Sequence, residues 1–368
     1  MTIAPFPPLP AADLAHAIGL VAPPLWERLR GQRIFLTGGT GFVGKWLLAT
    51  LAEADRRQDL GVEVVVLSRD PAAFAAQAPH LASARGVRLM QGDVRELAGE
   101  AGRFGIVIHA ATDVVATHPP IDTFDTCVTG TRRALDFALR AGATDFLLVS
   151  SGAVYGVQPP ELAGVPESHP GAPDSLVPGS AYGLGKRASE WLVNAHAAQH
   201  GLRTTIARCF AFVGPGLPLD KQFAVGNFLR DAMAREPIAI QGDGTPCRSY
   251  LHAADMAGWL WKILFAGAPG AAYNVGGTQA VSIAELARRV SELLGSTAPV
   301  TLAREPVPGQ AASRYVPDVS KARRELDLPE PLSLDEAILR TARWHLDARA
   351  GAAGAASSAS SNPHGSGR

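Results

Sequence analysis

The chain has 368 residues, of which 47% are hydrophobic and 18% charged, a composition typical of an enzyme-sized globular protein and unlike that of a disordered chain. Lys+Arg and Asp+Glu both number 34, so no net charge attracts the protein to nucleic acid or to an anionic membrane. Three cysteines, Cys127, Cys209 and Cys247, lie far apart without a C-x-x-C pair, which argues against a disulfide framework or a structural zinc site, and we expect no bound metal.

The two ends of the sequence look peripheral. Residues 1–30 form a Pro-rich lead-in with one short helix expected near 11–20, and residues 347–368 form a small, polar, low-complexity tail that we expect to be disordered. The N-terminus lacks the basic region of a signal peptide, and no apolar run approaches the roughly 20 residues that span a bilayer. We therefore expect a cytoplasmic protein.

Short β-rich runs alternate with longer amphipathic helical patterns from residue 33 onward. The expected strands cover 33–39, 62–68, 87–93, 105–112, 145–151 and 203–214, and the expected helices cover 44–57, a segment from 71, 127–142 and 181–201. Asp70 and Pro71 suit the N-cap and the first position of the second helix. This alternation predicts an α/β fold with a doubly wound parallel sheet.

The regular alternation fades beyond Gly214, into a mixed α/β region that continues to about Asp347. We interpret this C-terminal part as a smaller lobe that holds a substrate. The expected division assigns 31–214 and 245–268 to a dinucleotide-binding domain, and 215–244 and 269–346 to the lobe.

A glycine-rich loop, "TGGTGFVGKW", connects the first strand to the first helix. Gly39, Gly41 and Gly44 satisfy G-x-G-x-x-G, and Gly38 with the last two satisfies G-x-x-G-x-x-G. A strand–loop–helix of this kind lets the backbone approach a pyrophosphate, and it aims helix N–H groups at the negative charge. We predict a dinucleotide site formed by Gly38, Gly41, Phe42, Val43 and Gly44.

The end of the second strand bears on the choice between two nicotinamide cofactors. An acid there would bind the ribose hydroxyls of NAD(H), whereas "LSRD" offers Ser68 and Arg69, which suit a 2′-phosphate. Asp70 is the competing acid, although its position before Pro71 is better explained as a helix cap. We favour NADP(H) over NAD(H).

Residues at the ends of the next two strands could also contact a dinucleotide. Asp93 and Val94 are placed to meet the adenine, and Ala110 and Ala111 can pass beneath the cofactor without blocking it. A role as simple strand-end residues explains each of these positions equally well.

Tyr182 and Lys186 are spaced i, i+4 on one face of a predicted helix. A phenol ordinarily titrates near pH 10, and a nearby ammonium would draw its pKa toward the working range. Y-x-x-x-K is common by chance, but here it follows both a glycine loop and a strand that ends in Ser151. This order predicts an acid–base pair.

Taken together, "TGGTGFVG", "SSGAVYG", "SAYGLGK", "GDGTPCRSYLHAADMA" and "YNVGG" resemble the extended short-chain dehydrogenase/reductase family, in its NAD-dependent epimerase/dehydratase group. The resemblance spans residues 32–330. It implies a Rossmann-type domain, a C-terminal nucleotide-sugar lobe and a catalytic set of Ser151, Tyr182 and Lys186. It also implies that Tyr182 and Lys186 contact the cofactor and that Ser151 contacts the substrate. The implied substrate is a nucleoside-diphosphate sugar. The implied assembly is a homodimer joined through residues 127–140 and the helix of Tyr182.

The sequence departs from the family pattern at several positions. Sugar 4,6-dehydratases of the family carry an Asp-Glu pair where this chain has Gly152 and Ala153, so 4,6-dehydration is not expected. Cys127 replaces an asparagine that supports the active-site helix, and a thiol is a poorer hydrogen-bond partner. Ala211 replaces a frequent substrate-contacting asparagine. These changes indicate a substrate geometry of its own.

The resemblance also implies residues that bind the substrate diphosphate. Arg248 and Arg314 match two family arginines, whose guanidinium groups suit phosphate oxygens. Asn227 could face the same cleft, although a polar residue near a helix N-terminus explains it equally well. We expect His109 and His252 to be structural.

Three functions are compatible with these residues. The first is an NADP(H)-linked 4-ketoreductase acting on a nucleotide-linked 4-keto-6-deoxyhexose. The second is a nucleotide-sugar 4-epimerase with tightly bound NAD, and the third a catalytically silent dinucleotide-binding sensor.

Overall fold

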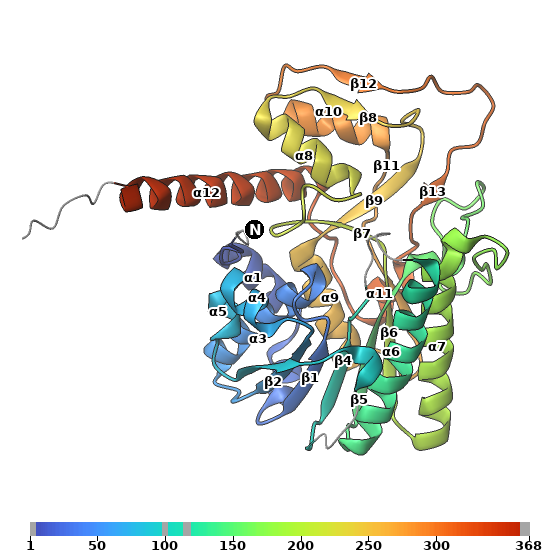
Figure 1. Ribbon diagram of the computed structural model, residues 1–368. Coiled ribbons are helices and arrows are strands. Elements are labelled where there is room, and N and C mark those ends of the chain that lie inside the picture. The colour runs from blue at the N-terminus through green and yellow to red at the C-terminus, as the bar shows by residue number, and fades with distance from the viewer. Residues whose placement is uncertain (1–4, 98–101, 113–118, 361–368) are drawn as a thin grey trace, which may run out of the picture.

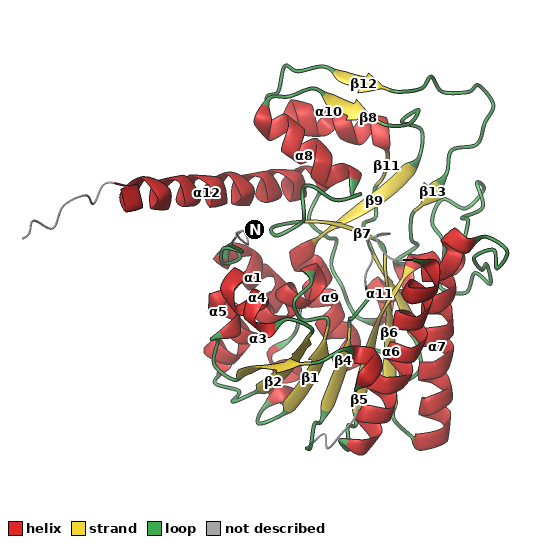
Figure 2. Ribbon diagram, in the orientation of Figure 1, coloured by secondary structure: helices red, strands yellow, loops and turns green. Residues whose placement is uncertain are grey.

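The computed structural model describes residues 5–97, 102–112 and 119–360. Its largest element is a parallel sheet of seven strands (Figures 1 and 2). In spatial order the strands are β10 (Ala272–Val275), β6 (Arg203–Cys209), β5 (Asp145–Ser151), β4 (Ile106–His109), β1 (Arg33–Thr37), β2 (Glu63–Ser68) and β3 (Val87–Gln91). The order reverses between β1 and β4, which is the place where open α/β sheets bind ligands. The predicted doubly wound α/β fold is confirmed.

Strand β5 shows how the sheet buries both of its faces. Phe146 and Leu148 belong to one hydrophobic core, whereas Leu147 and Val149 belong to the other, because successive side chains of a strand point to opposite faces. All four are buried. This is why the strand reads as a continuous apolar run instead of an alternating one.

Two groups of helices cover these faces. One face carries α6 (Pro120–Arg140) and α7 (Ala181–His200), which run side by side along the sheet (Figure 1). The other carries α1 (Ala11–Gly19), α3 (Phe42–Gln58), α9 (Ala253–Ala266) and α11 (Ser320–Glu325), with the short α2 (Pro23–Trp26), α4 (Pro71–Gln77) and α5 (Pro79–Ala82) nearby. Helix α6 begins earlier than residue 127, the predicted start, because Pro120 suits the first helical position.

A smaller lobe stands above the carboxyl ends of the strands (Figure 2). It contains β7 (Ala211–Val213), β9 (Cys247–His252), β11 (Ala280–Ser282) and β13 (Arg314–Tyr315) in one sheet, and β8 (Ile238–Ile240) with β12 (Val300–Leu302) in another. Helices α8 (Ala224–Ala234) and α10 (Ile283–Leu293) pack on these strands around a separate core. The predicted strand 203–214 is therefore two strands in two sheets.

The described structure divides the chain differently from the expected domains at two places. Strand β10, expected in the lobe, is an edge strand of the main sheet and pairs with β6. Strand β9, expected in the dinucleotide domain, pairs with β7, β11 and β13 of the lobe. The chain thus crosses between the two parts more often than the sequence indicated.

The ends of the described chain are more ordered than expected. Helix α1 lies where the sequence predicted a helix, and α12 (Leu334–Ser360) extends well into the segment that we expected to be disordered. The reason is that residues 349–356 are mostly alanine, which has the highest helix propensity. The rest of the expected tail, 361–368, lies outside the described residues. No helix in the described ranges is long and apolar enough to cross a bilayer.

Candidate active site

The loop between β1 and α3 brings backbone close to backbone. Gly38 has a φ of +73°, and a Cβ there would come within 2.5 Å of the backbone of Ala110. A Cβ on Gly44 would lie 2.3 Å from the carbonyl oxygen of Gly38. Glycine is therefore required at both positions. Helix α3 begins at Phe42, directly after this loop, so its first N–H groups, including those of Phe42 and Val43, have no partner within the helix. They lie at the end of the sheet, where they could bind an anion.

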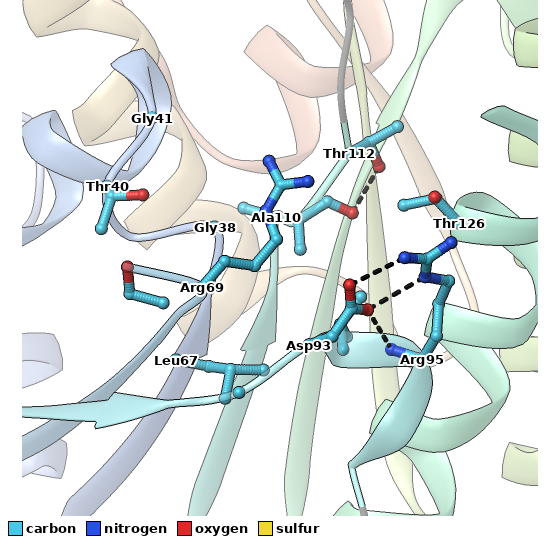
Figure 3. A pocket seen from close by; sticks show the side chains of 14 residues that line it. Gly38, Thr40, Gly41, Leu67, Arg69, Asp93, Arg95, Ala110, Thr112 and Thr126 are labelled. Atoms are coloured by element: carbon cyan, nitrogen blue, oxygen red, sulfur yellow. Dashed lines mark hydrogen bonds and ion pairs between the residues drawn. The ribbon is translucent and has the colours of Figure 1, made fainter. Parts of the chain in front are cut away.

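A pocket opens directly beside this loop, at the ends of β1 to β4 (Figure 3). Eight predicted cofactor residues line it: Gly38, Gly41, Ser68, Arg69, Asp93, Val94, Ala110 and Ala111. Thr40, Leu67, Gly92, Arg95, Thr112 and Thr126 complete the lining and were not predicted. The close-packed glycine turn and the polar lining fit a dinucleotide. Phe42, Val43 and Gly44 are in the first turn of α3 instead of the lining.

The acidic groups near this pocket already have partners. Asp70 caps α4 by accepting a hydrogen bond from the Ala73 N–H at 2.9 Å, as predicted. The Asp93 carboxylate accepts two bonds from the Arg95 guanidinium, at 3.0 and 2.9 Å. This guanidinium holds the pKa of Asp93 below its ordinary value. Arg69 extends into the space between the glycine loop and Asp93 (Figure 3).

The three predicted catalytic residues meet where β5 ends. Ser151 is the last residue of β5, and its hydroxyl acts on the phenol of Tyr182, in the first turn of α7, by lowering the pKa of that phenol. One turn later, the buried Lys186 Nζ donates to the Val149 carbonyl at 2.8 Å and lies 6.0 Å from the centre of the Tyr182 ring. A strand end and one helical turn thus bring together a hydroxyl, a phenol and an ammonium.

The electrostatics of this group differ from the expectation. Burial raises the pKa of Tyr182 above its ordinary value, and the neighbouring Ser151 hydroxyl opposes that rise only in part. Burial also lowers the pKa of Lys186, whose ammonium donates to the Val149 carbonyl. Tyr182 is therefore a protonated phenol at neutral pH, suited to donating a proton.

A series of hydrogen bonds between uncharged side chains connects the main sheet, through α6, to the helix α7 that carries Tyr182 and Lys186. The ring nitrogens of His109 lie 2.7 Å from Thr37 Oγ1 and 3.1 Å from Thr131 Oγ1, and Thr131 donates to Ser189 of α7. Burial lowers the pKa of His109 to about 3, so the ring stays neutral. His109 is structural, as predicted.

Cys127 occupies the contact between α6 and α7. A Cβ on Gly185 would lie 2.7 Å from the Cβ of Cys127, so the two helices touch at this point. Burial raises the pKa of the Cys127 thiol. The chain therefore fills the position of the family asparagine with a neutral, buried group.

Two aromatic residues at the catalytic centre were not predicted. A Cβ on Gly152 would lie 2.6 Å from the Phe210 ring, so this ring fills the space beside Gly152. The Tyr315 ring lies 4.6 Å from that of Phe210, and its hydroxyl is 3.3 Å from Ser151 Oγ. Sequence spacing offers no signal for this contact, which joins residues 164 positions apart.

The predicted substrate residues fall in different places. In the paired strands β9 and β13, Arg248 lies opposite Tyr315, whereas Arg314 lies opposite Cys247. Because neighbours in register share a face, Arg248 is on the face of Tyr315 and Arg314 on the other, where it donates to the Ala163 carbonyl at 3.1 Å. The structure does not bring the two arginines together on one face.

Asn227 lines a separate pocket of about 510 Å³ in the lobe. Further residues around it are Asp220, Lys221, Phe228, Arg230, Ile240, Gly242 and Pro246. Its volume is in the range of small-molecule sites. The described residues include no group of three or more His, Cys, Asp or Glu side chains that could hold a metal ion.

Comparison with known proteins gives consistent results. The sequence model of the "NAD dependent epimerase/dehydratase family" matches residues 34–276. UDP-glucuronic acid decarboxylase 3 of Arabidopsis thaliana is 31% identical over 311 residues, which is 83% of this chain and 87% of that protein.

Two solved structures are similar over most of the chain. The dTDP-glucose 4,6-dehydratase DesIV of Streptomyces venezuelae, solved with NAD, is 27% identical, with a TM-score of 0.72 over 86% of this chain and 98% of that one. Epimerase Mth375 of Methanothermobacter thermautotrophicus is 26% identical, with a TM-score of 0.73 over 88% and 95%. With its glycine loop and parallel sheet in place, the chain belongs to the NAD-dependent epimerase/dehydratase family of nucleotide-sugar enzymes.

Proposed function

We propose that the protein is a 4-ketoreductase that acts on a nucleotide-linked 4-keto-6-deoxyhexose. A bound dihydronicotinamide cofactor would supply the hydride that C4 needs. Tyr182 donates its phenolic proton to the C4 oxygen, so that the ketone becomes a secondary alcohol. Ser151 positions that oxygen, and Lys186 holds the nicotinamide ribose. The phenolate that remains on Tyr182 takes up a proton from solvent before the next turnover.

The observation that carries this proposal is the chemistry around Ser151. The phenol of Tyr182 is the proton donor beside it, and the Phe210 ring fills the space next to Gly152. Removal of water from C5 and C6 needs an acid and a base, and Gly152 and Ala153 provide neither. Hydride and proton exchange at C4 needs only the groups that are present.

Arg69 supports NADP(H) as the preferred cofactor. Its side chain extends into the cofactor pocket, where a guanidinium could bind a 2′-phosphate (Figure 3). Asp70, the acid that could bind a 2′-hydroxyl instead, is engaged as the cap of α4. NAD, which the dehydratase DesIV binds, is the alternative.

A redox-neutral reaction is the second candidate, and the names of the relatives favour it. Mth375 is described as an epimerase, and the plant relative as a decarboxylase of UDP-glucuronic acid. In a 4-epimerase the same residues would first remove and then return the hydride and the proton at C4. Ser151, Tyr182 and Lys186 suit both reactions.

The test combines identification of the cofactor with turnover. Mass spectrometry of the released cofactor and nucleotide is followed by assays with NADPH, NADH and the UDP- and dTDP-linked 4-keto-6-deoxyhexoses. We expect steady oxidation of NADPH that falls about 100-fold or more in Tyr182→Phe. Epimer formation without net cofactor change would establish the second candidate, and no turnover with any of these sugars would overturn the proposal.

We also propose that the protein is a homodimer joined through α6 and α7. On these helices Ile121, Phe124 and Trp191 are 80%, 40% and 69% exposed. Exposed large apolar side chains, and aromatic ones above all, are enriched at protein interfaces.

A further inference from the structure

The smaller lobe contributes a second phenol to the catalytic centre. Tyr315 reaches from β13 to the end of β5, where its hydroxyl lies 3.3 Å from Ser151 Oγ and 3.4 Å from the carbonyl oxygen of Cys209. Two phenols therefore act together with Ser151: Tyr182 from α7 and Tyr315 from the lobe.

The partners of these hydroxyls determine the direction of the hydrogen bonds. A carbonyl oxygen can only accept, so Tyr315 donates its single proton to Cys209. The oxygen of Tyr315 is then the acceptor for the Ser151 hydroxyl. The Ser151 oxygen also accepts a hydrogen bond from the Ala153 N–H at 3.1 Å, which leaves it one lone pair for the reacting groups. The result is one chain of bonds, from Ser151 through Tyr315 to the Cys209 carbonyl.

Packing holds the Tyr315 ring in this position. The ring lies 4.6 Å from Phe210, with 36° between the planes, and the Arg248 guanidinium is 5.8 Å from its centre. Phe210 is itself fixed against Gly152. An oriented hydroxyl on a packed ring is a rigid hydrogen-bond partner for Ser151.

We propose that Tyr315 is a positioning residue that orients the Ser151 hydroxyl toward the reacting oxygen of the sugar. This inference rests on the proposed function, because it assumes that Ser151 and Tyr182 act on one C4 oxygen. It extends that function because Tyr315 belongs to the lobe, so the lobe supplies one group of the catalytic centre. The strand of Tyr315, β13, also pairs with β9, the strand of Arg248. Docking of the nucleotide sugar in the lobe and alignment of Ser151 are then linked through two neighbouring strands.

The charges at the site are consistent with this role. Burial raises the pKa of Tyr315 to about 12, so its hydroxyl remains protonated at neutral pH. While Ser151 donates its proton to the Tyr315 oxygen, it cannot donate to a Tyr182 phenolate. Loss of the Tyr315 hydroxyl frees that proton to stabilise the phenolate and should therefore lower the pKa of Tyr182, which a purely structural residue would not do.

Tyr315→Phe tests the inference because it removes the hydroxyl and keeps the packed ring. We expect kcat to fall about 10- to 100-fold, the loss typical of a misaligned reacting group, while KM for the nucleotide sugar changes less than about twofold. The alkaline limb of the pH–rate profile should move to lower pH. Tyr273→Phe is the matched control, because that phenol bonds Ala268 and Glu325 in another part of the molecule. It should leave kcat and the profile unchanged.

A second readout does not depend on turnover. The chain has five tyrosines, so ¹³C labelling of the phenol carbons gives a spectrum that single substitutions can assign. Tyr315→Phe should shift the Tyr182 signal, Ser151→Ala should shift both the Tyr182 and Tyr315 signals, and Tyr273→Phe should shift neither.

The outcomes separate the inference from the proposed function. Unchanged kcat and pH profile in Tyr315→Phe, a loss confined to KM, or a Tyr182 signal that does not move would overturn the role of Tyr315. An enzyme without turnover on any ketosugar, in which the Tyr182 signal still responds to Tyr315→Phe, would contradict the proposed reaction alone.

Discussion

Arg69 stands at the end of β2, where a nicotinamide dinucleotide presents either a 2′-hydroxyl or a 2′-phosphate. Charge-assisted bonds to a phosphate contribute about 1.5–3 kcal/mol, which corresponds to roughly 10- to 150-fold in affinity. We predict that Arg69→Ala raises KM for NADPH by about this factor and changes KM for NADH less than about threefold. Steady-state kinetics with the two cofactors measure the difference.

Arg95 provides the matched control for Arg69. It lines the same pocket, but its guanidinium is bonded to Asp93 at 2.9 and 3.0 Å. Arg95→Ala should therefore affect NADPH and NADH to the same extent. An equal effect of Arg69→Ala on both cofactors would contradict the NADP(H) preference.

The junction between β5 and the following turn depends on the absence of a side chain at residue 152. A Cβ there would meet the Phe210 ring at 2.6–2.8 Å, closer than ordinary contacts allow. We predict that Gly152→Ala lowers the free energy of unfolding by about 1–3 kcal/mol, the usual cost of overpacking. Urea denaturation measures this loss.

Two further variants establish the cause of that loss. Gly19, near the end of α1, has open space around it, so Gly19→Ala should change stability by no more than about 0.5 kcal/mol. Combining Gly152→Ala with Phe210→Leu should cost less than the sum of the two single changes, because a smaller side chain relieves the clash. Strict additivity would mean that Phe210 is not what excludes a side chain at 152.

Considering the whole molecule, the features that could be predicted are those encoded in neighbouring residues. The strands of the main sheet, the cap at Asp70 and the order of Ser151, Tyr182 and Lys186 follow from apolar runs, local hydrogen bonds and short motifs. These depend on a few residues at a time. The sequence alone therefore predicted the α/β fold and placed eight of its proposed cofactor residues around one pocket at the strand ends.

Features that depend on contacts between distant segments could not be predicted. The apolar run 203–214 breaks at Phe210 because that ring packs against Gly152 and β7 joins the sheet of the lobe. The contact of Tyr315 with Ser151 and the separation of Arg248 from Arg314 result from the register of β13 on β9. Neither spacing nor composition contains that register.

The proposed homodimer can be tested on the surface of α6 and α7. If these helices form the dimer interface, a charge at Trp191, which is 69% exposed, would be buried without a partner. We predict that Trp191→Arg shifts the protein from dimer to monomer, measured by light scattering after gel filtration. Leu346→Arg, at a 46% exposed position on α12, should leave the mass unchanged. A wild-type protein that elutes as a monomer would contradict the proposed assembly.

Two buried histidines make the stability of the whole molecule dependent on pH. His109 and His252 are 1% and 0% exposed, and burial lowers the pKa of each from 6.5 to about 3. The unfolded chain therefore binds protons near pH 6.5 that the folded chain does not bind until about pH 3. The contribution of these rings to the free energy of unfolding is complete above pH 6.5 and is lost as the pH falls toward 3. Each histidine loses about 1.4 kcal/mol of this contribution per pH unit. We predict a loss of about 3 kcal/mol between pH 7.5 and 5.5, measured by urea denaturation.

His109 is the better of the two positions for testing this linkage. His252 lies 4.0 Å from Asp13, whose pKa is raised by burial, and the titration of that acid opposes the effect of the histidine. Around His109 the nearest partners are the hydroxyls of Thr37 and Thr131, which do not titrate. His109→Gln should therefore remove more than half of the pH dependence, even though it lowers stability at every pH. The same change at His200, exposed at the end of α7, should leave the pH dependence intact, and an equal effect of both variants would show that burial of His109 is not its cause.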